Sequence, residues 1–422
     1  MEILEGMIHT ELKKILSFPR IGTKLVARRL ERLGITLNDS QLADIRMQLE
    51  CMRSDKGTME LCGFEKHSSE RGSEGIEYLL HIDLSDCDQD IQEITDCVAE
   101  NVRKAIPKIS IEVSAVISTA LKDQLYSILQ QRKRQRDQFE LNLNKVWARP
   151  IDLLEMLLAI SLEAGEGFKN QFRSEASRNE DLVFDVLTRL HARACQISSE
   201  IVTLLRSGHA DGAHARWRSL HEIAVVGFFI ESYGNDVAER YLLHEGVESY
   251  KATKLYQDYC ARLQYEPLTN EEVRIARERY EHLLNRFGRS YTGDYGWAST
   301  ALGKKNPTFR DIERNVLLDH MRPYYKLASH NIHANPKGIL FKLGLAKDSG
   351  EVLLAGSSNM GLADPGHGCA ITLTQITIAL LLTRPNIDRL VMCRVLLQLA
   401  GEIGKEFIQA HESFSQDTNG LA

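Results

Sequence analysis

The fold class is decided by residues 182–234, LVFDVLTRLHARACQISSEIVTLLRSGHADGAHARWRSLHEIAVVGFFIESYG. Apolar residues recur every three or four positions on both sides of RSGHADG, a segment with two glycines that interrupts the pattern. The sequence therefore predicts two long helices joined by a turn, an antiparallel helix hairpin whose second helix is capped by Asp211.

Helical periodicity continues on both sides of this hairpin. Pro150 suits the first position of a helix, so we predict a helical bundle domain at 149–414, followed by a disordered tail at 415–422. Within the bundle, GILFKLGLAKDSGEVLLAG, residues 338–356, predicts one β-hairpin insertion. The other helices are expected at about 236–264, 270–287 and 308–333, with two apolar helices separated by Pro385 at the end.

Residues 1–148 predict a smaller N-terminal α+β region. A short amphipathic helix, GTKLVARRLERLGI, belongs to a helix pair that is either a small bundle or a helix-turn-helix, and ordinary packing is the favoured interpretation. Two strands are expected between about 58 and 85, and a helix from Asp88 is expected to end near Pro107. A second helix, from about 109 to 147, carries a basic run. The chain as a whole is predicted to be mainly α.

Composition excludes several classes of protein. The chain has 422 residues, a formal net charge of -6 and a pI of about 6.2, so nucleic-acid binding must come from a local patch. Eight cysteines without a Cys-x-x-Cys pair fit free thiols in a reducing cytosol. The N-terminus lacks the pattern of a signal peptide, and the apolar stretch from Cys369 is short and rich in threonine. We therefore expect a cytoplasmic protein that does not enter a membrane.

The stretch GHADGAHARWRSLHE, residues 208–222, is the main candidate for chemistry. At 100° per residue, His214, Arg218, His221 and Glu222 share one face of the second hairpin helix. His214 is expected in the first turn, where the helix dipole keeps an imidazole neutral, the form that a general base requires.

A second polar group, YYKLASHNIHANP, places His330 and His333 at the end of another helix. If the two helices pack, the imidazoles, the arginines and Glu222 meet in a half-buried pocket. The alternative is a satisfied polar network that only fixes the packing. His191 and His244, each isolated on its own helix, are interpreted as structural.

No metal or cofactor is predicted. The histidine spacing fits neither a zinc site nor a di-iron bundle, and the motifs of dinucleotide enzymes, P-loop NTPases and α/β-hydrolases are missing. A metal site made of His214, His221, His330 and His333 has no support from the spacing, and most familiar enzyme classes are excluded.

The blocks GAHARWRSLHE and SHNIHANP resemble a bacterial domain family of unknown function, over about residues 150–412. Arg216-Trp-Arg-Ser-Leu-His221 is also similar to the Arg-x4-His motif of HEPN-type helical ribonucleases. That resemblance implies an arginine that stabilises the phosphorane and a histidine that moves protons at the 2′-hydroxyl. By helix geometry Arg218 is the better partner of His221, because Arg216 lies about 140° away from it.

Two functions are therefore carried forward. The first is a metal-independent ribonuclease in phage defence or a toxin, a homodimer that binds RNA through the basic run. The second is a non-catalytic helical interaction or scaffold module of a defence system, which binds a partner protein through its N-terminal region. The basic run consists of Arg132, Lys133, Arg134 and Arg136, and its favoured interpretation is a solvated helix face, with RNA binding as the alternative.

Overall fold

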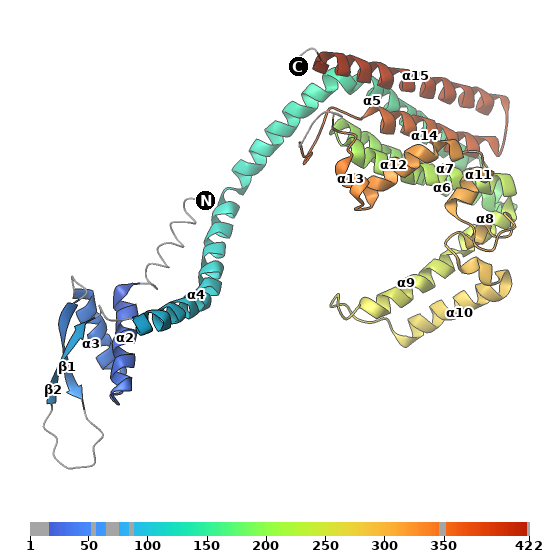
Figure 1. The fold of residues 1–422 in the computed structure, drawn as a ribbon. Coiled ribbons are helices and arrows are strands. Elements are labelled where there is room, and N and C mark those ends of the chain that lie inside the picture. Colours follow the sequence, from blue (N-terminus) through green and yellow to red (C-terminus); the bar gives the residue numbers. More distant parts are fainter. Residues whose placement is uncertain (1–16, 52–55, 65–75, 84–87, 346–351, 420–422) are drawn as a thin grey trace. The chain divides into compact units, whose positions relative to one another are not determined.

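The computed structural model describes residues 17–51, 56–64, 76–83, 88–345 and 352–419, and the chain is mainly α-helical (Figure 1). The first elements are α2 (Phe18–Arg32), α3 (Asp39–Cys51), β1 (Lys56–Phe64), β2 (Ile76–Asp83), α4 (Asp88–Asp123), α5 (Leu125–Arg178) and α6 (Leu182–Arg206). They are followed by α7 (Ala210–Tyr233), α8 (Asn235–Leu243), α9 (Glu245–Tyr259), α10 (Asn270–Phe287), η1 (Arg289–Thr292) and η2 (Gly296–Ala298). The last elements are α11 (Phe309–Asn315), η3 (Asp319–Met321), α12 (Arg322–Ile332), α13 (Pro336–Leu340), α14 (Ala363–Leu382) and α15 (Ile387–Asn419).

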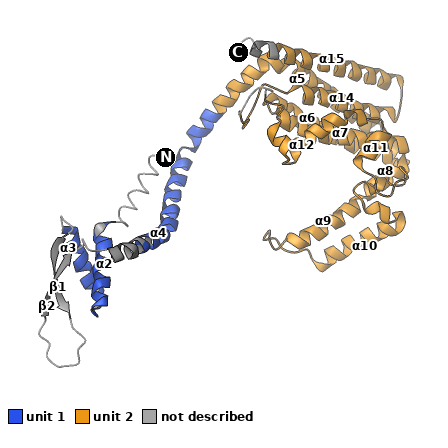
Figure 2. Cartoon of the chain, viewed as in Figure 1, with its two compact units in different colours: residues 1–132 blue, residues 133–422 orange. Residues whose placement is uncertain are grey.

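The chain divides into two compact units, residues 1–132 and 133–422 (Figure 2). The division falls within α5, earlier than the boundary at 148/149 that the sequence suggested. In the first unit, β1 and β2 form an antiparallel hairpin in which Lys56 pairs with Asp83, so the N-terminal strands were predicted correctly. Residues 1–16 lie outside the described residues.

The second unit is built around the predicted helix hairpin, formed by α6 and α7. The turn between these helices uses Gly208 at φ +73°, where a Cβ would lie 2.6 Å from the Phe139 ring. Helix α14 packs against α6, α7 and α15, and its apolar residues are mostly buried. Within the described residues, α14 is the one helix long and apolar enough to cross a membrane, but its burial is that of a core helix.

Two prolines do not mark helix boundaries as predicted, Pro107 as the end of a helix and Pro150 as the start of one. Helix α4 continues through Pro107, and α5 continues through Pro150, which is buried. A proline inside a helix costs about 3 kcal/mol through one lost hydrogen bond and a steric clash. At Pro150 this cost is offset because Leu143, Trp147, Ile151 and Leu154 form one continuous buried stripe across the proline.

The β-hairpin predicted at 338–356 is wrong where it can be observed. Residues 336–340 form the short helix α13, opened by Asn335, whose side chain accepts a hydrogen bond from Gly338 N at 2.9 Å. Residues 352–356 are not a strand either. Asn335-Pro336 is a helix-start signal, which was stronger than the alternation of apolar residues. The expected turn, residues 346–351, lies outside the described residues.

Three other boundaries differ from the expectation. The helix predicted at 236–264 is divided at His244 into α8 and α9, and the one predicted at 308–333 is divided into α11, η3 and α12. Helix α10 has the bounds predicted for it, 270–287, and a capping box formed by Thr269 and Glu272 opens it. At the C-terminus, α15 continues to Asn419 into the predicted tail, and residues 420–422 lie outside the described part.

Candidate functional site

Helix α7 holds a stack of three rings in the core of the second unit. The Trp217 indole lies between two imidazoles, 5.4 Å from the His214 ring and 5.5 Å from the His221 ring, centroid to centroid. Trp217 Nε1 donates to Thr372 Oγ1 on α14 at 3.1 Å. Gly368 makes this contact possible, because a Cβ there would lie 2.8 Å from Trp217 Nε1. The indole therefore fixes the position of both histidine rings.

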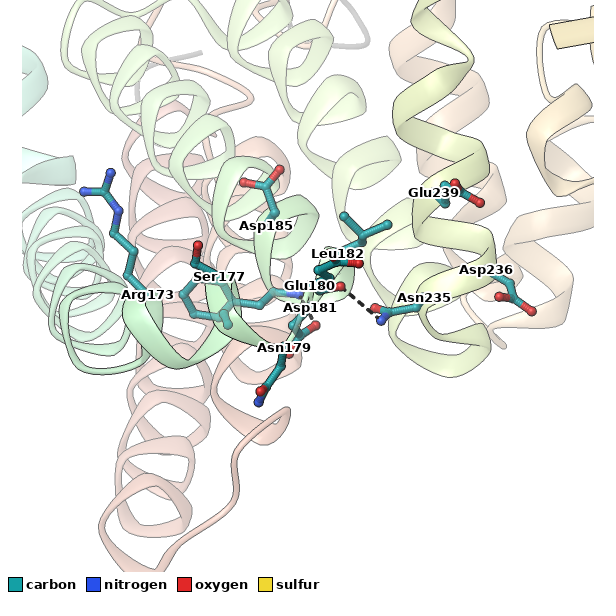
Figure 3. Close-up of a pocket in the computed structure, with 12 residues that line it drawn as sticks. Arg173, Ser177, Asn179, Glu180, Asp181, Leu182, Asp185, Asn235, Asp236 and Glu239 are labelled. Atoms are coloured by element: carbon teal, nitrogen blue, oxygen red, sulfur yellow. Dashed lines mark hydrogen bonds between the residues drawn. The ribbon is translucent and has the colours of Figure 1, made fainter. Parts of the chain in front are cut away.

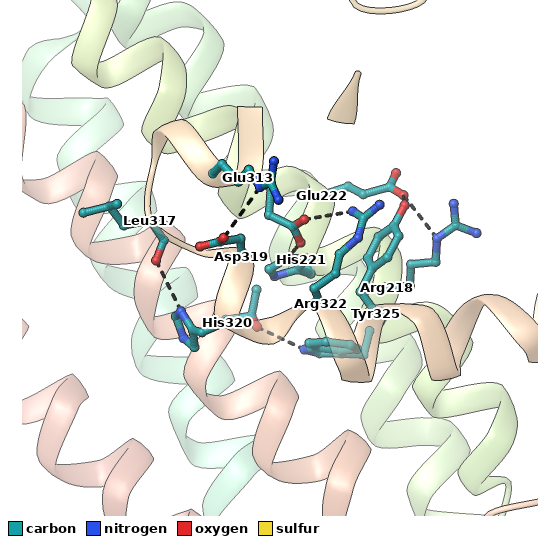
Figure 4. A network of polar contacts seen from close by, with 12 residues as sticks. Arg218, His221, Glu222, Glu313, Leu317, Asp319, His320, Arg322 and Tyr325 are labelled. Carbon is teal, nitrogen blue, oxygen red and sulfur yellow. Dashed lines mark hydrogen bonds and ion pairs between the residues drawn. The ribbon is translucent and has the colours of Figure 1, made fainter. Parts of the chain in front are cut away.

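His221 is joined to a buried carboxylate that the sequence did not indicate. Its Nε2 lies 3.0 Å from Oε1 of Glu313, a residue of α11 with 0% of its surface exposed. Oε2 of Glu313 accepts from Nη1 of Arg322 at 2.8 Å (Figure 4). Because a carboxylate only accepts hydrogen bonds, the proton of the His221 ring lies on Nε2, and this N–H donates a hydrogen bond to Glu313. The three side chains connect α7, α11 and α12.

An outer layer of the same network reaches the surface. The Tyr325 hydroxyl donates to Glu222 Oε1 at 2.5 Å, and Arg218 Nε lies 3.3 Å from the same oxygen (Figure 4). The guanidinium groups of Arg218 and Arg322 lie 4.8 and 5.0 Å from the centre of the Tyr325 ring. Burial, followed by the bond to Glu222, raises the pKa of Tyr325 well above its usual range, so it remains a neutral donor.

We call these six residues the α7 cluster: Arg218, His221, Glu222, Glu313, Arg322 and Tyr325. Two guanidinium groups face two carboxylates, so the cluster is electrically balanced when His221 is neutral. Buried ion pairs of this kind require every partner, because an unmatched charge in the interior is costly.

The break between α11 and α12 brings the members of the cluster together. Leu317 adopts φ +58°, in the left-handed region, and His320 Nδ1 donates to its carbonyl at 3.2 Å. One continuous helix over 308–333 would carry Glu313 and Arg322 nine residues apart along one axis, beyond direct contact. The reversal at Leu317 places both side chains against α7. Such a backbone conformation costs on the order of 1–3 kcal/mol in a residue other than glycine.

The other predicted site residues on α7 lie elsewhere. Arg216 faces α6, where Nη2 pairs with Glu200 Oε2 at 2.5 Å, so its separation from His221 is as the helical projection predicted. His214 is buried, and burial lowers its pKa from 6.5 to about 4, although Asp211 acts in the opposite direction. The ring is therefore neutral as expected, but because of burial. The N-cap of α7 is His209, not Asp211, which accepts from Leu343 N at 3.0 Å.

The predicted meeting of four histidines is only partly right. Helices α7 and α12 do pack, but it is Arg322 and Tyr325 in the first turn of α12 that reach the His221 region. His330 contacts Asn335 at 2.8 Å, and His333 is exposed beyond the end of α12. Among the described contacts, none joins either of them to His214 or His221.

Sequence reasoning missed Glu313 and Arg322. Glu313 could have been found, because Phe309, Ile312 and Val316 place it within an apolar stripe, where a carboxylate must have a partner. The isolated histidines were interpreted correctly as structural. His191 Nε2 contacts Thr377 Oγ1, and His244 Nε2 donates to the carbonyls of Tyr291 and Gly293.

The basic run lies on α5, with all four side chains exposed. None of Arg132, Lys133, Arg134 and Arg136 forms an ion pair within the part of the chain that the structure describes. Among the residues that the structure describes, no group of three His, Cys, Asp or Glu side chains is arranged to hold a metal ion.

A surface pocket of about 700 Å³ lies away from the α7 cluster, where α6 and α8 begin (Figure 3). Asn235 Nδ2 donates to the carbonyl of Glu180 across it at 3.3 Å. Acidic residues near helix N-termini are favoured by the helix dipole, which accounts for Asp185 and Asp236 there. The pocket's negative charge makes it unsuitable for RNA. Its carboxylates are Glu180, Asp181, Asp185, Asp236 and Glu239.

Comparison with known proteins leaves the activity open. No curated protein and no solved structure matches the chain. The model of a family of unknown function (DUF5677) matches residues 184–351. All six residues of the α7 cluster lie within this span, so the cluster belongs to the part of the chain that is similar to that family.

Proposed function

We propose that this chain is a non-catalytic helical interaction module, in which the α7 cluster is a structural network that holds α11 and α12 on α7. In this proposal the module acts in the cytoplasm as a homodimer, within a bacterial defence system. Its partner binds outside the cluster, through the N-terminal region.

The carrying observation is the burial of Glu313 with both carboxylate oxygens engaged. Glu313 is 0% exposed, and the His221 side chain bonded to it is 1% exposed. A general base must come within about 2.6–3.2 Å of the proton that it takes from the substrate. His221 instead directs Nε2 at a buried carboxylate, and its Nδ1 is also buried. This geometry supports packing more than proton transfer to RNA.

The arginines support the same proposal. Arg216 is paired with Glu200, and Arg218 with Glu222, so each guanidinium already has a carboxylate beside it. A phosphate would have to compete with these carboxylates for the same cations.

A metal-independent ribonuclease, similar to the HEPN type, is the second candidate. One observation favours it: the Arg218 and Arg322 side chains are 21% and 24% exposed and lie against the same tyrosine ring. Two adjacent cations near the surface could stabilise the charge that develops on a phosphate.

RNA cleavage in EDTA separates the two candidates. Single-stranded, hairpin and duplex RNA are incubated with the full chain, with Arg218→Ala, and with Arg216→Ala as the control of equal charge on the same helix. We expect no cleavage in any sample. Metal-free cleavage that falls 100-fold or more in Arg218→Ala at an unchanged melting temperature, but persists in Arg216→Ala, would refute the proposal and establish the ribonuclease.

A further inference from the structure

Helix α2 carries a concentration of positive charge in a chain that is acidic overall. It contains five basic residues and one acidic residue, Glu31, in a chain whose net charge is -6. Four of the basic residues are spaced by four positions and are exposed. We call them the α2 stripe: Arg20, Lys24, Arg28 and Arg32.

The first unit holds the α2 stripe in place. The opposite face of α2 is buried through Gly22, Thr23, Val26 and Leu30, and α2 packs against α3 and α4. At Gly22 the packing is close, because a Cβ would lie 3.0 Å from Leu49 Cδ1. The helix therefore presents its cations to solvent in a fixed row. Surface ion pairs are worth roughly 0–1 kcal/mol, so exposed cations can exchange such contacts for a phosphate.

Helix α3 has the opposite charge on its exposed face. Asp39, Asp44 and Glu50 outnumber Arg46, which is itself 3.5 Å from Glu50. Asn38 and Gln41 cap α3 reciprocally, and Gly34 at φ +80° forms part of the turn after α2. In a DNA-binding helix-turn-helix the first helix crosses the sugar-phosphate backbone and the second reads the bases. Of these two helices, only the first, α2, has the positive charge that a contact with DNA requires.

The length of the stripe matches a DNA groove. From Arg20 to Arg32 the helix rises about 18 Å, whereas the major groove of B-form DNA is about 12 Å wide. A helix across the groove can therefore reach phosphates on both sides with its terminal cations. The deep, narrow major groove of duplex RNA excludes this arrangement.

A lipid surface fits α2 poorly. A helix that binds a membrane inserts an apolar face below the headgroups. The apolar face of α2 is already buried in its own unit, so only the cations remain outside.

We propose that the α2 stripe binds the phosphate backbone of double-stranded DNA without sequence specificity. This inference concerns the first unit and does not rest on the role of the α7 cluster. Four phosphate contacts predict a slope of about -3.6 for the logarithm of the binding constant against the logarithm of salt concentration. Affinity should fall roughly 100-fold between 50 and 200 mM salt.

Fluorescence anisotropy with a labelled 20-base-pair DNA duplex and the full chain tests the proposal. The test variant changes the four residues of the stripe to Gln. The control changes Arg103, Lys104, Lys108 and Lys122 to Gln, four exposed cations of α4 in the same unit. We expect the stripe variant to lose at least 10-fold in affinity and most of its salt dependence, and the control to stay within about threefold of the parent.

Several results would overturn this assignment: no binding by the parent chain at 50 mM salt, equal losses in both variants, or tighter binding to an RNA duplex or to phosphatidylserine vesicles. Far-UV circular dichroism checks that the stripe variant folds. If it does not fold, Lys24→Gln and Arg28→Gln are measured singly, and each is expected to reduce the salt slope by about one. An unchanged slope in both refutes the proposal. RNA cleavage by the α7 cluster is assayed separately, so the two proposals fail independently.

Discussion

The α7 cluster and the α2 stripe differ in the burial and the sign of their charged side chains. In the cluster, two arginines are matched by two carboxylates, and Glu313 is fully buried. In the stripe, cations of one sign stand exposed along a helix whose other face is packed. Interior charge must be balanced within the fold, whereas the contacts of exposed charges are weak and can be exchanged for those of a partner. A dense group of polar residues in a sequence can therefore indicate either stability or binding, and burial separates the two.

The largest expected effect breaks the balance inside the cluster. Glu313→Gln removes the negative charge between His221 and Arg322 and should lower the free energy of unfolding by about 3–5 kcal/mol, measured by urea denaturation. Glu200→Gln is the matched control, because its pair with Arg216 is 32–38% exposed, and it should cost no more than about 1 kcal/mol. Equal stability of the two variants would contradict the structural role of the cluster.

The free energy of unfolding, measured at several pH values, tests two buried histidines that have no carboxylate as a hydrogen-bond partner. Burial lowers the pKa of His214, and of His191, from 6.5 to about 4. The unfolded chain therefore takes up these protons near pH 6.5 and the folded chain near pH 4, so stability is lost as pH falls through this window. Each histidine contributes on the order of 3 kcal/mol to that loss.

The corresponding variant is His214→Gln, which should flatten the dependence of the unfolding free energy on pH between about 6.5 and 4. His282→Gln, at an exposed histidine of α10, serves as the control and should keep the slope of the parent. A parent chain equally stable at pH 7 and pH 4.5 would show that these imidazoles are not protected by the fold.

A smaller effect is expected at the surface of the cluster. Arg218→Ala removes an ion pair to Glu222 and the cation over Tyr325, and should cost about 1–2 kcal/mol. Arg216→Ala should cost less than about 1 kcal/mol, because it ends a more exposed pair. Thermal unfolding of both variants measures the difference. A larger loss of stability in Arg216→Ala would show that the contact of α7 with α6 contributes more than the surface of the cluster.

The smallest effect is expected in the α2 stripe. Changing its four residues to Gln should alter the free energy of unfolding by less than about 0.5 kcal/mol, because exposed substitutions away from the core are nearly neutral. Urea denaturation of the full chain checks this value. A loss of several kcal/mol would show that the stripe holds the first unit together, and would remove the contrast with the cluster.

Local signals predicted the helices well and the chain reversals poorly. The apolar periodicity of α6 and α7 and the capping box of α10 were sufficient, since each depends on residues within a turn or two. Pro150 was misjudged because continuous burial on both sides of it outweighs the local preference. The break at Leu317 was missed because leucine carries no signal for a left-handed conformation.

The sequence by itself determined that Arg218, His221 and Glu222 share a region of one helix, because 3.6 residues per turn is a local rule. Only the tertiary structure decided what that region does. Glu313 and Arg322 lie 92 and 101 residues beyond His221 along the chain, and the reversal at Leu317 brings them to His221. Their approach excludes water and converts a row of titratable side chains into a closed network, because buried charges are stable only when every partner is present.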